Sequence, residues 1–267
     1  MPIITLLTDF GLRDTFIGVM KGVIWSIAPN TQIVDLTHEI PPQRVVDGAL
    51  AIAGAAPYFP AGTIHVCVVD PGVGTARRPM LTAIGDQYFI GPDNGIFSLL
   101  IQKAKELNTP PVYIALNKPR YWLPQVSNSF HGRDIFAPVA AHLASGVKVE
   151  EFGDPFEEPV LITIPVPQKT AEGWLGQIMH VDHFGNLVTN LTREHLNPGM
   201  RVNIFVKNTI INGVVDTFGS KPTGELIAML DSSGQLAISV VNGSAADRLG
   251  VLTDEQVAIT YTSEQAS

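Results

Sequence analysis

The chain has 267 residues, of which 45% are hydrophobic and 16% charged, and its mean hydropathy is +0.21. This composition is typical of a compact globular protein and excludes disordered and collagen-like chains. The 17 basic and 25 acidic residues leave a net charge of −8. No nucleic-acid partner is therefore expected, because a phosphate backbone binds concentrated positive charge.

The first half of the chain alternates short β-branched runs with helical periodicity. Apolar residues three or four positions apart predict helices, whereas short β-branched runs that end at a polar residue predict strands. This alternation indicates an α/β domain in which helices cover both faces of a mainly parallel sheet. Strands are predicted over 3–8, 32–37, 64–70 and 112–116, and helices over 17–27 after an N-cap at Asp14, 46–53, 96–107 and 134–144.

The pattern changes where prolines become frequent. Pro155, Pro159, Pro165 and Pro167 interrupt any helix and predict a linker. Short strand candidates separated by Gly, Asn and Ser turns follow, and they indicate a small all-β barrel or sandwich. We therefore expect an α/β domain over 1–165 and a barrel-like domain over 166–267. The strand candidates of the second domain are 174–181, 187–191, 201–206, 226–230, 236–241 and 256–262.

Signals for export or membrane insertion are missing from the sequence pattern. The first residues lack a basic region followed by a long apolar stretch, and no run approaches the roughly 18 apolar residues of a membrane helix. Cys67 is the single cysteine, so no disulfide forms within the chain. We expect a cytoplasmic protein without a membrane partner.

Polar side chains gather where predicted strands end, and ligands of α/β sheets bind at the carboxyl ends of strands. Asp9 follows the first strand, where its carboxylate either accepts hydrogen bonds from a ribose diol or caps a loop. Asp70 and Arg77 flank the glycine-rich turn after the third strand. They form either a functional pair or a buried structural ion pair. This turn lacks the GxxxxGK[ST] spacing of a phosphate loop.

A histidine and two further turns complete the candidates. His131 precedes the last helix of the first half as either a structural or a catalytic group, and Asp134 is expected to be an N-cap. The segments 182–186 and 230–234 have the composition of hairpin turns. The 7 histidines are scattered without HExxH or paired-cysteine spacing, so no metal site is predicted.

Taken together, five motifs in this order resemble a known family. They are TDFG at 8–11, DPGVGTARR at 70–78, FHGRD at 130–134, DHFGN at 182–186 and SSG at 232–234. The family is that of the S-adenosyl-L-methionine (SAM) hydroxide adenosyltransferases. These are adenosine-forming SAM hydrolases related to the SAM-dependent fluorinase and chlorinase, and the resemblance spans nearly the whole chain.

The resemblance implies a reaction and an assembly. Water or hydroxide attacks C5′ of the SAM ribose and displaces L-methionine, leaving adenosine, with SAM and water as substrates and no cofactor. It also implies an N-terminal α/β domain, a C-terminal β-barrel domain and a homotrimer with active sites between neighbouring subunits. The catalytic Asp, Arg and His of the family correspond here to Asp70, Arg77 and His131, with either Asp70 or His131 accepting the proton.

The resemblance also implies substrate contacts. They are Asp9 to the ribose hydroxyls, Phe130 near the ribose or adenine, Asp182 to the methionine ammonium, Phe184 beside it in the same motif, Asn186 to the adenine edge and Ser232 to the methionine carboxylate. Two positions depart from the fluorinase pattern. Ser233 stands where the fluorinase has an arginine, and Gln43 stands where it has a tryptophan.

Two other functions share parts of this pattern. A halogenase uses the same SAM-binding motifs, but a carboxylate at Asp70 would repel a halide. A non-catalytic SAM or adenosine-binding module would keep the binding residues without turnover. The nucleoside formed from SAM distinguishes all three functions.

Overall fold

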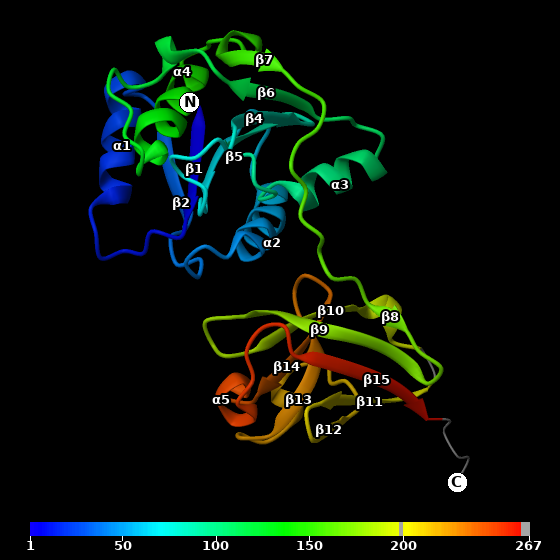
Figure 1. Ribbon diagram of the computed structural model, residues 1–267. Helices are drawn as coiled ribbons and strands as arrows, with labels where there is room; N and C mark the ends of the chain where they lie inside the picture. Colours follow the sequence, from blue (N-terminus) through cyan, green and yellow to red (C-terminus); the bar gives the residue numbers. More distant parts are fainter. Residues whose placement is uncertain (198–199, 263–267) are drawn as a thin grey trace. The chain divides into compact units, whose positions relative to one another are not determined.

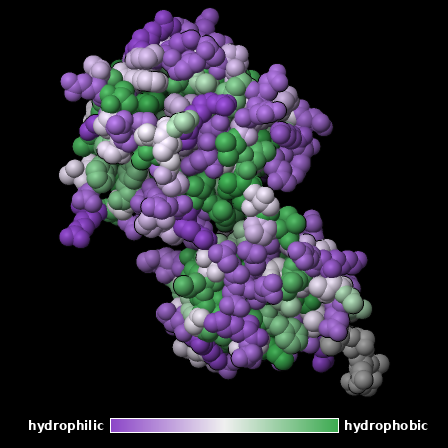
Figure 2. Space-filling view, viewed as in Figure 1, coloured by the Kyte–Doolittle hydropathy of each residue, from purple (hydrophilic) through white to green (hydrophobic). Residues whose placement is uncertain are grey.

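The computed structural model describes residues 1–197 and 200–262, which form two compact units (Figure 1). Unit 1 covers Met1–Thr163, and unit 2 begins at Ile164. Each unit has its own hydrophobic core, and Figure 2 shows hydrophobic residues between hydrophilic ones on the viewed face of each. Such a surface is ordinary, because polar side chains cannot cover a globular unit completely. Within the described residues, no helix has the length and apolar character needed to cross a bilayer.

Unit 1 is built on a seven-stranded sheet with the order β2-β1-β3-β5-β4-β6-β7. Strand β1 pairs in parallel with β2 and β3, and β3 pairs in parallel with β5. The remaining neighbours, β5 with β4, β4 with β6 and β6 with β7, are antiparallel. The strands are β1 (Ile3–Thr8), β2 (Gln32–Thr37), β3 (Ile64–Val68), β4 (Pro79–Ile84), β5 (Gln87–Pro92), β6 (Val112–Leu116) and β7 (Gly153–Pro155).

The predicted α/β class is confirmed, and the sheet is mixed because β4, which forms a hairpin with β5, and the edge strand β7 run antiparallel to the other strands. Neither β4 nor β5 is among the sequence predictions. The signal was present, because Gly85-Asp86 separates two apolar runs and a two-residue turn beginning with Gly is typical of a hairpin. Gly85 has the positive φ of 59° that such a turn requires.

Helices cover both faces of this sheet (Figure 1). Successive side chains of a strand point to opposite faces, so Leu6 packs in one layer with α1 and α4, while Leu7 packs in the other with α2 and α3. Val66 and Cys67 of β3 divide in the same way. The helices are α1 (Phe16–Ile27), α2 (Val45–Ala55), α3 (Ser98–Glu106) and α4 (Ala137–Ala144), with short helical turns at Ala56–Tyr58, Pro119–Tyr121, Gly132–Phe136 and Val149–Phe152.

Two predicted helix caps are wrong. Helix α1 begins at Phe16 with Thr15 in the N-cap position, so Asp14 lies one residue outside the cap. Asp134 lies inside the π-helical turn Gly132–Phe136 that precedes α4, where its carboxylate binds other groups. A sequence pattern locates the apolar face of a helix more reliably than its first residue.

Unit 2 is a barrel-like antiparallel sheet, which confirms the predicted all-β character. Its described residues form eight strands, of which β8 and β12 are not among the sequence predictions. Its order is β12-β11-β15-β9-β10-β14-β13, with β8 paired to β9. A bridge between Val215 and Met229 links the segment after β12 to β13 and nearly closes the sheet. The elements are β8 (Gln168–Lys169), β9 (Gly173–Val181), β10 (Leu187–Thr192), β11 (Arg201–Val206), β12 (Thr209–Asn212), β13 (Leu226–Leu230), β14 (Gln235–Val240), α5 (Ala245–Leu249) and β15 (Gln256–Thr262), with short helical turns at Arg193–His195 and Phe218–Ser220.

Candidate active site

The turn after β3 brings Asp70 and Arg77 together. Strand β3 ends at Val68, and the following residues curl back through hydrogen bonds from Val73 N to Asp70 O (3.2 Å) and from Thr75 N to Gly72 O (3.2 Å). A Cβ on Gly72 would lie 3.2 Å from Arg77 Cγ, so glycine leaves room for the arginine to lie across the turn. The turn therefore folds the guanidinium onto the carboxylate seven residues earlier in the chain.

Asp70 and Arg77 form a buried, multiply bonded ion pair. Arg77 Nε donates to Asp70 Oδ1 at 2.9 Å and to Oδ2 at 3.0 Å, and Nη2 also donates to Oδ2. The side chains of Arg77 and Asp70 are only 9% and 4% exposed. Charge-assisted bonds of this kind fix both position and orientation, and losing one partner would leave an uncompensated buried charge.

A distant segment adds His131 to this pair. Gly74 of the turn has a φ of +76°, and a Cβ there would lie 2.2 Å from the carbonyl oxygen of Asn128. This close approach holds the segment before His131 against the turn. His131 Nδ1 lies 3.0 Å from Arg77 Nη2. Because a guanidinium only donates, Nδ1 accepts, and His131 is the neutral tautomer with its hydrogen on Nε2.

The electrostatics of the site favour this neutral imidazole. Burial lowers the pKa of His131, and the charge of Arg77 lowers it further. Asp70, Asp134 and a backbone hydrogen bond with Ser127 act in the opposite direction without compensating, so the pKa stays below its ordinary value. His131 is therefore uncharged at neutral pH.

Arg77 has one donor left over. Its Nη1 is buried and has no hydrogen-bond partner among the described residues. The guanidinium also lies over the ring of Phe136, 5.1 Å from the ring centroid. A buried, unpaired N–H costs free energy, so native structures keep such a group for a reason. Here the free donor belongs to the central member of a charged trio.

Asp134 and Ser127 hold the histidine segment in place. Asp134 is fully buried, and its Oδ2 accepts from the backbone N–H of Ser127 at 2.8 Å and from the Ser127 hydroxyl at 2.7 Å. Arg133 Nε donates to Oδ1 of the same carboxylate at 2.6 Å. Ser127 and Asn128 are not among the sequence predictions, since serine and asparagine before a helix are ordinary loop residues.

The TDFG loop lies near the same segment through its aromatic ring. The rings of Phe10 and Phe130 contact edge to face with centroids 5.8 Å apart, and Phe16 lies 5.2 Å from Phe130. Asp9 accepts from the backbone N–H of Gln43 at 2.8 Å. The structure thus connects the loop of Asp9 to Phe130 and, through it, to the neighbouring His131.

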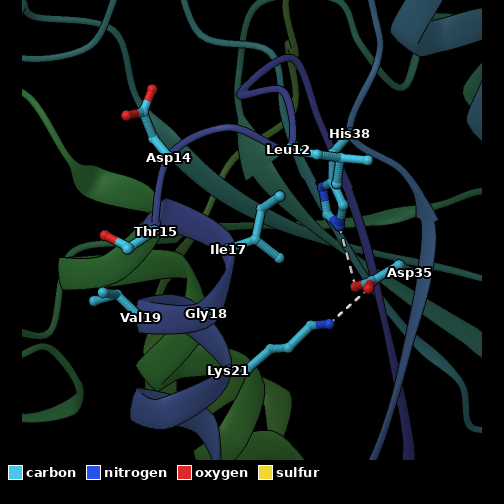
Figure 3. Close-up of a pocket in the computed structure, with 9 residues that line it drawn as sticks. All are labelled: Leu12, Asp14, Thr15, Ile17, Gly18, Val19, Lys21, Asp35 and His38. Atoms are coloured by element: carbon cyan, nitrogen blue, oxygen red, sulfur yellow. Dashed lines mark hydrogen bonds and ion pairs between the residues drawn. The ribbon is translucent and has the colours of Figure 1, made fainter.

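A cavity of about 460 Å³ opens beside the TDFG loop (Figure 3). Lys21 Nζ and His38 Nε2 both point at the carboxylate of Asp35, at 2.6 and 3.1 Å. Burial raises the pKa of Asp35, but these two partners outweigh it and lower the net value. None of the predicted site residues lines this cavity, whose wall is formed by Leu12, Asp14, Thr15, Ile17, Gly18, Val19, Lys21, Asp35 and His38.

In unit 2, Asp182 orders the turn that carries Phe184 and Asn186. Its Oδ1 accepts from the backbone N–H groups of Phe184 and Asn186, each at 2.9 Å, and its Oδ2 accepts from Asn186 Nδ2 at 2.7 Å. Gly185, with a φ of +80°, lies so close to Ser244 that a Cβ would be 2.1 Å from the serine hydroxyl. The turn leaves Phe184 73% exposed.

The turn that carries Ser232 is also ordered by an aspartate that binds backbone N–H groups, but it lies at a different end of the sheet from the Asp182 turn. Asp231 Oδ1 accepts from Ser233 N at 2.8 Å and from Gln235 N at 2.9 Å. In the pairing of β10 with β14, Leu187 lies opposite Ile238 and Thr192 lies opposite Gln235. The turns before Leu187 and before Gln235 therefore stand at opposite ends of the strand pair, separated by roughly 17 Å along β10 and roughly 10 Å along β14 at ~3.3 Å per residue.

The structure thus brings together Asp70, Arg77 and His131, and connects Phe130 with the loop of Asp9. It also groups Asp182, Phe184 and Asn186 in one turn, whereas Ser232 stands apart from them within unit 2. Among the residues that the structure describes, no group of three or more His, Cys, Asp or Glu side chains is arranged to hold a metal ion.

The chain thus consists of an α/β unit that carries a buried charged trio, followed by a barrel-like unit. Comparison with known families identifies the class of proteins that has these two domains. Residues 4–153 match the SAM hydroxide adenosyltransferase N-terminal domain, and residues 176–258 match the C-terminal domain. The chain belongs to the SAM hydroxide adenosyltransferase family.

Relatives with known names cover nearly the whole chain. An (R)-S-adenosyl-L-methionine hydrolase of Salinispora tropica is 42% identical over 97% of this chain and 98% of its own. One of Thermus thermophilus is 40% identical over 92% and 94%. A fluorinase of an Actinoplanes species is 28% identical over 89% and 90%. A crystal structure of an uncharacterized conserved protein from Thermotoga maritima, 34% identical, has a TM-score of 0.89 and covers 96% of this chain and 99% of that one.

Proposed function

We propose that this protein hydrolyses SAM to adenosine and L-methionine. Two findings support the proposal: relatives at about 40% identity are named (R)-S-adenosyl-L-methionine hydrolase, and the chain belongs to their family. The observation that carries it is the trio itself, because Arg77 keeps a buried, unpaired N–H beside the carboxylate of Asp70. Such a donor suits a water molecule that must gain hydroxide character.

The chemistry needs help with the nucleophile rather than the leaving group. The sulfonium of SAM departs as a neutral thioether, so no acid is required at sulfur. Water, in contrast, has a pKa of about 15.7 and attacks carbon poorly. In the proposed step the water oxygen bonds to C5′ while the C5′–S bond breaks and its electron pair stays on sulfur. Holding that oxygen in line with sulfur supplies roughly 7 to 11 kcal/mol.

The hydrogen-bond pattern supports Asp70 as the proton acceptor in this proposal. The Nδ1 lone pair of His131 is occupied by Arg77, so the imidazole accepts a proton only after that bond breaks. Each oxygen of a carboxylate has two lone pairs, so Asp70 retains acceptor capacity beside its bonds to Arg77. Asp70 takes the proton from the attacking water and releases it to solvent, and neutral His131 orients Arg77.

The family resemblance also supports binding roles for the remaining site residues. Asp9 and Phe130 contact the ribose and adenine, Asn186 the adenine edge, Asp182 and Phe184 the methionine side, and Ser232 the methionine carboxylate. We also propose a cytoplasmic homotrimer that uses water as co-substrate and needs no cofactor, with its domains at 1–165 and 166–267. Light scattering measures the trimer directly, and treatment with a chelator should leave turnover unchanged.

Incubation with SAM in oxygen-18 water tests the function. We expect adenosine whose 5′-hydroxyl carries the label, together with L-methionine, in the presence or absence of added chloride or fluoride. A 5′-halogenated nucleoside would show a halogenase. Bound SAM without any new nucleoside would show a binding module.

A further inference from the structure

The segment that follows β5 contacts both ends of the turn that carries Asp70 and Arg77. Asn94 Nδ2 donates to the carbonyl oxygen of Val69 at 2.8 Å. Asp93 N donates to the carbonyl oxygen of Arg78, also at 2.8 Å. Val69 immediately precedes Asp70, and Arg78 immediately follows Arg77. Two successive residues thus hold the chain just before the carboxylate and just after the guanidinium.

This segment is itself firmly held. Asn94 Oδ1 accepts from Ile96 N at 3.2 Å, and Asn94 N donates to Pro92 O at 3.0 Å, so the amide side chain has one orientation. Pro92 ends β5 and lies opposite Pro79, the first residue of β4. Strand β5 also pairs with β3, from which the turn departs. The contacts therefore connect the turn to three adjacent strands of the sheet.

The side chain of Asp93 contacts groups outside the turn and the side chain of Arg78. Its Oδ1 accepts from Val160 N at 2.7 Å, and its Oδ2 lies 3.7 Å from Arg78 Nη1. Arg78 lies over the ring of Phe156, 4.0 Å from the centroid. The two adjacent arginines of the turn thus have different partners. Arg77 contacts Asp70 and His131, while Arg78 lies near Asp93 and Phe156.

Resting on the proposed function, we propose that Asp93 and Asn94 are positioning residues for the reaction, because they keep Asp70 and Arg77 in register with His131. The bonds within the turn fix Asp70 and Arg77 relative to each other, whereas the Asp93 and Asn94 contacts fix the turn relative to the sheet. A misplacement near 1 Å can cost about 100-fold in rate. The Asn94 amide is the side-chain donor in this arrangement. Replacing it with a carboxylate removes the donor and sets oxygen against the Val69 carbonyl.

A shift of the turn has a consequence at His131 that can be measured without substrate. Burial and the charge of Arg77 both lower the pKa of His131. If Asn94→Asp moves Arg77 away from Nδ1, the second cause weakens and the histidine titrates at higher pH. The new carboxylate of Asn94→Asp would by itself also raise the pKa of a nearby histidine, so the uncharged variant Asn94→Ala has to raise the midpoint too. A residue that only stabilised the fold would not change the midpoint in Asn94→Ala.

The test compares Asn94→Asp with Asn117→Asp in the full-length protein. Asn117 Nδ2 donates to Asp154 at 2.7 Å on the surface of unit 1, so the control also loses a donor, away from the turn. For Asn94→Asp we expect kcat for adenosine formation to fall about 10- to 100-fold with KM changed less than about 3-fold. We also expect a higher His131 midpoint by NMR, and the control to match the wild type in both.

An unchanged kcat, a change confined to KM, or an unmoved His131 midpoint would each overturn the positioning role. Asn94→Ala removes the donor without adding a charge, so a His131 midpoint that rises in Asn94→Asp but not in Asn94→Ala would also overturn the positioning role. The same variant gives both readouts if Asn94→Asp does not fold. A wild-type protein that forms no adenosine would refute the proposed function alone, since the His131 titration of the substrate-free protein still decides whether Asn94 positions the trio.

Discussion

Asp70 in unit 1 and the turn aspartates of unit 2 serve different purposes. In unit 1, Asp70 binds a guanidinium that also contacts a histidine from a distant segment. In unit 2, Asp182 and Asp231 bind backbone N–H groups of their own turns. The first arrangement keeps charge buried and oriented, as transition-state stabilisation requires, whereas the second shapes loops that present neighbouring side chains. We therefore expect changes at the Asp70–Arg77–His131 trio to affect chemistry and changes in the two turns of unit 2 to affect binding.

The largest effect is expected at the trio. Asp70→Asn keeps the shape of the side chain but removes its charge and its capacity as a base, so kcat should fall about 1,000-fold while SAM binding remains measurable. Adenosine chromatography and calorimetry measure the two quantities. The exposed carboxylate of Asp86 in the β4–β5 turn provides the control, because Asp86→Asn should leave both unchanged. Arg77→Ala should also abolish adenosine release. Turnover at the wild-type rate in both trio variants would refute the assignment.

Acid should weaken unit 1 through His65. This histidine is fully buried, donates to or accepts from Thr5 Oγ1 at 2.7 Å and stacks on Phe89. Burial lowers its pKa to about 4. Because the unfolded chain, with a pKa near 6.5, binds the proton more readily, stability is complete above about pH 6.5 and falls towards pH 4, by roughly 3 kcal/mol.

Hydrogen exchange of the β3 amides at pH 7 and pH 4.5 checks this loss of stability. His65→Gln cannot titrate in this range and should flatten the dependence on pH. Unit 2 contains no fully buried histidine among its described residues, so its own amides should respond less. An equal response of the two units would contradict this difference between them.

Substituting two glycines distinguishes the cost of backbone strain from the cost of losing a contact between loops. Gly74 and Gly85 both have positive φ, but only a Cβ on Gly74 meets a neighbour, the Asn128 carbonyl. Gly85→Ala should cost about 1 kcal/mol of unfolding free energy from strain alone. Gly74→Ala should cost at least twice as much and lower kcat, because it separates the turn from the His131 segment. Urea unfolding and adenosine formation measure both, and equal costs for the two variants would refute the contact.

The smallest effect is expected in unit 2. Ser232→Ala should raise KM for SAM about 10-fold, the loss expected for one hydrogen bond to a charged group, while kcat stays the same. Ser233→Ala, in the same turn, should change neither constant. A KM unchanged by Ser232→Ala would exclude the serine as a carboxylate ligand.

The sequence by itself determined the alternation of strands and helices, the change to short strands after the proline-rich segment, and the identity of the charged residues at strand ends. Periodicity and turn composition are local properties, so they can be recognised without a fold. The β4–β5 hairpin was also readable from Gly85-Asp86. Boundaries were less accurate, as Asp14 and Asp134 show, because tertiary contacts decide where a helix begins.

Only the tertiary structure decided which polar groups meet. His131 reaches Arg77 across 54 positions of the chain because Gly74 admits the Asn128 carbonyl. Asn94 reaches Val69 because β3 and β5 are neighbours. The register of β10 with β14 likewise separates Ser232 from Asp182. These relations depend on strand order and close packing between distant segments, which no local pattern of residues records.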